Sequence, residues 1–61
     1  MEYRIRTWRN DSLVGYEHVS REDAGAAIHS FAKLVKAECK VAKQGHATVK
    51  IDDEHELFVM A

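Results

Sequence analysis

The chain has 61 residues, of which 46% are hydrophobic and 31% charged, and its formal net charge is −1. A chain of this length forms at most one domain with a thin core, and its apolar content is too high for a disordered tail. The balanced charge argues against both a wholesale nucleic-acid binder and an acidic mimic of nucleic acid.

Cysteine content and hydropathy add further bounds. Cys39 is the only cysteine, so an internal disulfide and a disulfide-stapled secreted fold are excluded. No apolar run approaches the ~18 residues that a membrane span needs, and the first residues lack the apolar core of a signal peptide. We therefore expect one soluble, cytoplasmic α+β domain over residues 1–61, with no membrane partner.

The chain begins with a predicted β-hairpin. Residues 2–9 and 13–19 alternate in polarity as half-buried strands do, and Asn10-Asp11 tolerates the left-handed backbone of a two-residue turn. This turn length determines which residues oppose one another. The expected cross-strand pairs are Thr7 with Val14, Ile5 with Tyr16, Tyr3 with His18, Trp8 with Leu13, and Arg4 with Glu17 as an ion pair.

One long helix is predicted from about residue 21 to about residue 43. Ser20 and Asp23 resemble a capping box at its start, and Gly45 provides a stop. Gly25 weakens the first turns but allows a close approach to the sheet. The apolar stripe that we expect to cover the sheet consists of Ala24, Ile28, Phe31, Val35, Cys39 and Ala42, flanked by Ala27 and Leu34.

A second hairpin is predicted from residues 46–52 and 56–61, joined by a polar turn. Its register is open, because a four-residue loop opposes Val49 to Phe58 whereas a three-residue loop opposes Val49 to Val59. A slip of one residue exchanges the buried face of a strand for its exposed face.

These elements predict a two-layer β-β-α-β-β architecture of the α+β class. One long helix packs on a four-stranded, mainly antiparallel sheet, and the other face of the sheet stays uncovered. The side chains expected on that uncovered face are Arg4, Arg6, Trp8, Leu13, Glu17, Thr48 and Lys50.

Basic residues recur on one face of the predicted helix at spacings of four, three, four and three. We call them the basic helix face; they are His29, Lys33, Lys36, Lys40 and Lys43. Like charges at this spacing repel one another, which favours an acidic docking partner. The alternative is an ordinary solvated face, because cations in the last turns also complement the helix dipole.

The uncovered sheet face offers a second candidate surface. We call Arg4, Arg6 and Trp8 the Arg/Trp sheet face. Exposed tryptophan and arginine are typical anchors of protein interfaces, so this face suits a protein partner or a homodimer. The same combination of charge and aromatic ring is also used to bind single-stranded nucleic acid.

The residues that could support catalysis or metal binding have simpler interpretations. Cys39 falls in the apolar stripe, where we expect a buried, unreactive thiol. The carboxylates around His55 belong to a polar turn, where water keeps them ionised. No zinc motif is present, although His46 and His55 could approach across the second hairpin with Asp52. We therefore predict no catalytic residues, no metal site and no cofactor.

The sequence thus favours a small non-enzymatic binding protein that docks on a larger protein or ribonucleoprotein. Either the basic helix face, the Arg/Trp sheet face, or both would supply the contact. In size and predicted layout the chain resembles small accessory proteins of phages and mobile elements, including inhibitors of the anti-CRISPR type, a resemblance of architecture only. The alternative is an RNA- or DNA-binding module that uses the same cations on phosphates.

Overall fold

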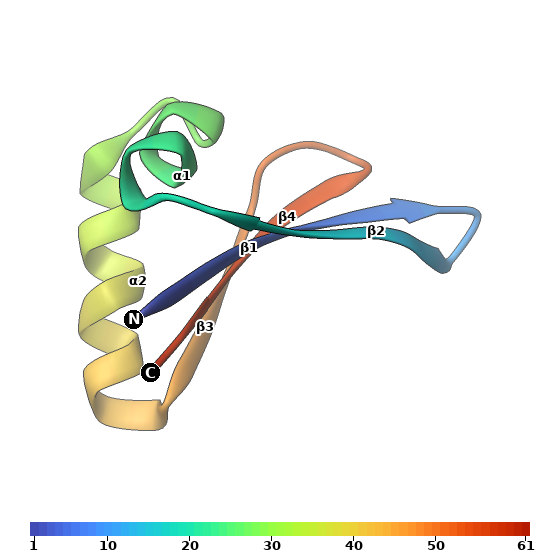
Figure 1. The fold of residues 1–61 in the computed structure, drawn as a ribbon. Coiled ribbons are helices and arrows are strands. Elements are labelled where there is room, and N and C mark those ends of the chain that lie inside the picture. The colour runs from blue at the N-terminus through green and yellow to red at the C-terminus, as the bar shows by residue number, and fades with distance from the viewer.

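The computed structural model describes residues 1–61. Its elements in chain order are β1 (Glu2–Arg9), β2 (Ser12–Val19), α1 (Arg21–Ala27), α2 (Phe31–Gln44), β3 (His46–Lys50) and β4 (His55–Met60). The strands form one antiparallel sheet in the order β2-β1-β4-β3. The helices lie together at one end of the strands, and the β1–β2 turn projects away from them (Figure 1). The predicted α+β class and four-stranded sheet are confirmed.

The prediction of one continuous helix is wrong, because the chain breaks between α1 and α2. His29 adopts a left-handed backbone with φ of 53°, and the side chain of Ser30 then accepts a hydrogen bond from the backbone N–H of Lys33. Ser30 is therefore a second N-cap, in addition to the predicted cap at Ser20. Gly25 allows the two helices to meet closely, since a Cβ there would lie 2.5 Å from the ring of Phe31.

The break also changes which face of α2 is buried. Leu34, Ala37 and Val41 face the sheet with at most 3% of their surface exposed. Phe31 and Val35, which belong to the predicted stripe, are 48% and 47% exposed. The predicted stripe assumed that one straight helix carries its apolar face through residues 24–42. The left-handed backbone at His29 ends α1, and α2 begins with a different orientation.

The hydrophobic core is small and contains residues from both the sheet and the helices. It consists of Tyr3, Ala24, Ile28, Leu34, Ala37, Val41, Ala47, Leu57 and Val59. Cys39 lies outside it and is exposed, so the predicted burial of the thiol is wrong. Neither helix is long and apolar enough to cross a membrane.

The first hairpin has the predicted turn but only part of the predicted register. Asn10 and Asp11 both have positive φ, as a two-residue turn of this kind requires. Trp8 opposes Leu13 as expected, and a bulge between Thr7 and Trp8 shifts the pairs of residues 3–7 by one residue. The shift separates Arg4 from Glu17, its expected ion-pair partner, and exchanges the residues of β2 between the two sheet faces. The observed pairs are Thr7 with Gly15, Arg6 with Tyr16, Ile5 with Glu17, Arg4 with His18 and Tyr3 with Val19.

Neither predicted register of the second hairpin is correct, because Val49 opposes Leu57. The turn is determined by Asp52, whose Oδ1 accepts hydrogen bonds from the backbone N–H groups of Glu54 and His55, both at 2.8 Å. The Ile51 N–H then donates to the His55 carbonyl at 2.9 Å. This local capping closes the loop earlier than the apolar pattern suggested.

Ser30→Ala should lower the free energy of unfolding by about 1 kcal/mol, because it removes the N-cap of α2. Urea unfolding followed by circular dichroism measures this loss. Ser12→Ala is the control, since Ser12 begins β2 and its side chain forms no hydrogen bond in the structure. An equal loss in the two variants would show that the Ser30 cap contributes nothing specific.

Candidate binding site

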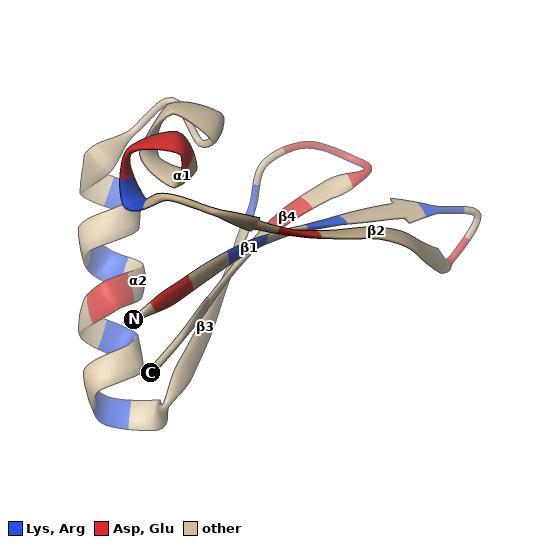
Figure 2. Cartoon of the chain, in the orientation of Figure 1, with Lys and Arg blue, Asp and Glu red and all other residues tan.

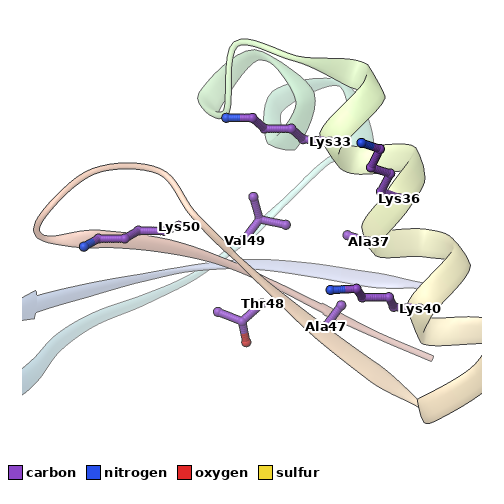
Figure 3. Close-up of a pocket in the computed structure, with 8 residues that line it drawn as sticks. All are labelled: Lys33, Lys36, Ala37, Lys40, Ala47, Thr48, Val49 and Lys50. Atoms are coloured by element: carbon purple, nitrogen blue, oxygen red, sulfur yellow. The ribbon is translucent and has the colours of Figure 1, made fainter.

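A groove lies between one flank of α2 and the edge strand β3, and it encloses about 360 Å³. Three lysines reach it from α2, and small or aliphatic side chains form its floor. We call this site the lysine groove. Its lining residues, drawn in Figure 3, are Lys33, Lys36, Ala37, Lys40, Ala47, Thr48, Val49 and Lys50.

The positive charge of the α2 lysines in the groove is not neutralised within the chain, whereas Lys50 lies opposite Glu56 and also lines a second pocket with the acidic residues of the β3–β4 loop. No carboxylate lines the groove, and every ion pair in the structure is formed by an arginine or a histidine rather than a lysine. In Figure 2, basic residues recur along α2 around a single acidic residue, Glu38, and acidic residues also gather in α1 and in the β3–β4 loop. The ammonium groups therefore repel one another and favour an anion between them.

The structure brings together only part of the predicted basic helix face. Lys33, Lys36 and Lys40 line the groove together. Lys43 lies in the last turn of α2, outside the lining, where its charge complements the helix dipole. His29 lies in the link between the helices, so it does not belong to the lysine face of α2. The prediction that all five residues share one helix face is therefore wrong.

Lys50 is the groove residue that sequence reasoning did not join to the other lysines. It is the last residue of the edge strand β3, and it borders the groove as well as the uncovered sheet face. No periodicity connects Lys50 with Lys40, because the two belong to elements with different repeats. Only the packing of α2 beside β3 brings them to one site.

The Arg/Trp sheet face is engaged within the chain. Trp8 Nε1 donates a 2.6 Å hydrogen bond to Glu56 Oε1. The Arg6 guanidinium lies 3.6 Å from the same carboxylate, sits 4.4 Å from the ring centroid of Phe58, and donates to Thr48 Oγ1 at 3.2 Å. These contacts compensate the Arg6 charge and occupy the indole N–H, so both are less available to a partner.

Arg4 is engaged in the same way at the other end of this face. Its guanidinium lies 4.9 Å from the ring centroid of Tyr16 and 3.7 Å from the Glu2 carboxylate. The bulge in the first hairpin makes this stacking possible, because it places Tyr16 on the uncovered face and moves Glu17 opposite Ile5. The predicted Arg4–Glu17 ion pair is therefore wrong.

Glu38 occupies the flank of α2 away from the lysine groove, where it ties three elements together. Its Oε2 accepts a 2.6 Å hydrogen bond from the Tyr3 hydroxyl on β1, and Arg21 on α1 donates to both carboxylate oxygens at 3.2 Å. The hydrogen bonds from Arg21 and Tyr3 hold the pKa of Glu38 below its ordinary value. Burial, followed by the bond to Glu38, raises the pKa of Tyr3. This network leaves the groove without a carboxylate on α2.

The histidines and the acidic loop do not form a metal centre. His55 Nδ1 lies 2.8 Å from Asp52 Oδ1. Backbone hydrogen bonding from Glu54, then the contact with His55, lowers the pKa of Asp52. His46 begins β3 at the opposite end of the hairpin and lies beside Phe58, so the predicted approach of His46 to His55 does not occur. No group of three potential metal ligands gathers in the chain.

The lysine groove is suited to electrostatic recognition. Its lining contains no carboxylate, thiol or imidazole that could exchange a proton with a bound molecule near neutral pH. Its cations project from a helix and a strand that pack on the same core, so the backbone positions that carry the lysines are fixed relative to one another. Comparison of the chain with protein-family models, with curated proteins and with solved structures gave no match.

Proposed function

We propose that this chain is a non-enzymatic, cytoplasmic binding protein that docks on an acidic surface of a larger protein through the lysine groove. One observation carries the proposal: three lysines of α2, together with Lys50 at the end of β3, line a groove that contains no carboxylate. An acidic partner would relieve their mutual repulsion and would not have to displace an internal ion pair. An inhibitor of the phage or mobile-element type, acting by occupying a site on its target, would use such a surface.

The Arg/Trp sheet face receives less support as a docking surface, whether for a partner or for a second copy. Trp8 and Arg6 are both bonded to Glu56. A partner that used them would have to replace those contacts, which reduces the net gain on binding.

The alternative function, RNA or DNA binding, would use the same lysines on phosphates. The groove floor argues for protein, because no aromatic ring lines it. Proteins that hold single-stranded nucleic acid combine cations with aromatic side chains on which the bases stack. Steep salt dependence and sensitivity to nuclease would distinguish this alternative.

Reversing two groove charges with Lys36→Glu and Lys40→Glu should weaken partner binding by about tenfold or more, because each reversal replaces attraction with repulsion. Both residues are exposed, so the fold should persist and circular dichroism should be unchanged. The measurement is affinity capture from a cell lysate, with and without nuclease, with the bound proteins quantified by mass spectrometry.

The matched control carries Arg9→Glu and Lys43→Glu, which change the net charge equally at exposed sites outside the groove lining. We expect a protein that the wild type and the control retain and the groove variant loses. Equal retention by all three would refute docking through the groove. Capture that disappears after nuclease treatment would refute the protein partner in favour of nucleic acid.

A further inference from the structure

The lysine groove follows the free edge of the sheet. The order β2-β1-β4-β3 leaves β3 with a partner strand on one side only. Successive side chains of a strand point to opposite faces, yet four consecutive residues of β3, from Ala47 to Lys50, line the groove. A groove lined in this way runs along the edge of the strand, where backbone donors and acceptors lie, rather than over one face.

The hydrogen-bond pattern identifies which backbone groups of β3 face outward. The Gly45 carbonyl accepts from the Ala61 N–H at 3.1 Å, and the Ile51 N–H donates to the His55 carbonyl at 2.9 Å. Residues that bond to the neighbouring strand alternate with residues that do not. The odd-numbered residues of β3 therefore bond to β4, and the N–H and C=O groups of Thr48 and Lys50 point out of the sheet, beside the lysine groove.

We propose that the lysine groove binds an extended acidic segment of a partner protein, which pairs with β3 as a fifth strand of the sheet. This inference rests on the proposed function and names the form of the partner. The free backbone groups of Thr48 and Lys50 would bond to the added strand, and the lysines of α2 would lie along one of its faces.

The alternative occupant of the free edge is β3 of a second copy of the chain, and the charge of this edge disfavours it. Two copies of β3 paired together would bring Lys50 and the flanking lysines of α2 from both copies into one interface. Lysine at a free edge opposes such self-pairing. A strand with carboxylates at alternate positions is complementary instead.

The first test titrates the protein with a short synthetic peptide of alternating glutamate and valine, followed by NMR of the backbone amides. The control peptide replaces each glutamate with glutamine, which retains the extended tendency and removes the charge. We expect the amides of Thr48 and Lys50 to shift and to gain protection from hydrogen exchange. The uncharged peptide should bind about tenfold more weakly.

The second test removes one outward donor without touching the bonds to β4. Thr48→Pro eliminates the outward N–H, a change that edge strands tolerate, and should weaken binding of the acidic peptide by about tenfold. Thr48→Val retains the N–H and loses only the hydroxyl that accepts from Arg6, so its affinity should stay close to that of the wild type. The NMR test of the unaltered protein decides the matter if Thr48→Pro does not fold.

The outcomes separate this inference from the proposed function. Peptide binding that leaves the Thr48 and Lys50 amides unchanged, but is lost in the Lys36→Glu and Lys40→Glu variant, would refute strand addition and retain the groove as an anion-docking surface. Tighter binding of a short oligothymidylate than of the acidic peptide would refute the inference in favour of nucleic acid. No binding of either probe, together with unaltered partner capture by the groove variant, would refute both proposals.

Discussion

Leu34→Ala should remove most of the stability of the protein at room temperature. The Leu34 side chain is completely buried between α2 and the sheet, and truncating such a residue costs about 3 kcal/mol because a cavity remains. A domain of this size without disulfides has a free energy of unfolding of only roughly 3–5 kcal/mol. Urea unfolding followed by far-ultraviolet circular dichroism should show a midpoint near zero denaturant and little folded baseline.

The matched control is Val35→Ala, the neighbouring substitution on the predicted stripe. Val35 is 47% exposed, and alanine has the higher helix propensity, so the free energy of unfolding should change by no more than about 0.5 kcal/mol. A larger loss for Val35→Ala than for Leu34→Ala would mean that the predicted stripe, and not the observed one, faces the sheet.

Glu38→Gln should lower the free energy of unfolding by about 2 kcal/mol near neutral pH. The carboxylate of Glu38 accepts hydrogen bonds from both Tyr3 and Arg21, and charge-assisted bonds are stronger than those an amide can offer. Most of the loss should come from the Tyr3 bond, because Tyr3 is buried whereas solvent screens the exposed Arg21. The fluorescence of Trp8, the only tryptophan, reports the urea transition.

The same network predicts how stability depends on pH. The pKa of Glu38 is lowered in the folded chain from an ordinary value of 4.5, so its contribution is complete above about pH 4.5 and is lost as the pH falls through the folded pKa. The pKa of Tyr3 is raised from 10.0, so its contribution is complete below about pH 10 and is lost as the pH rises through the folded pKa. Stability should therefore decline at both ends of this window.

Glu38→Gln should remove its own share of the acid-side decline and weaken the alkaline one, because Tyr3 would then lose its charged acceptor. Glu17→Gln is the control, since it removes an equal charge from an exposed side chain that forms no ion pair. A Glu38→Gln variant whose stability follows the wild-type pH curve would contradict a role for this network in the fold.

Local sequence determined the elements that depend on short-range chemistry. The alternation of residues 2–9 produced a strand because the period of side-chain direction is local. The Asn10-Asp11 turn, the Ser20 cap and the stop at Gly45 were all predictable, because each depends on the backbone preference or side chain of one or two residues. The α+β class followed from the order of these elements.

Tertiary packing decided which face of α2 is buried and how the strands are aligned, because the local sequence pattern allowed more than one answer to each. Residues 24–42 carry two overlapping apolar faces, and only the break at His29 and contact with the sheet selected Leu34, Ala37 and Val41 for burial. Ser30 is as good an N-cap as Ser20, but a continuous apolar stripe concealed it. The strand registers likewise depended on a bulge and on the hydrogen bonds of Asp52, neither of which changes the polarity pattern.

The candidate site shows the same division. The spacing of Lys33, Lys36 and Lys40 placed them on one helix face from the sequence alone, because the helical repeat is regular. Sequence could not show that Lys50 joins them, that Glu38 turns away to Tyr3, or that the edge of β3 borders the same groove. These facts arise from contacts between elements that follow no common period, so only the three-dimensional arrangement determines them.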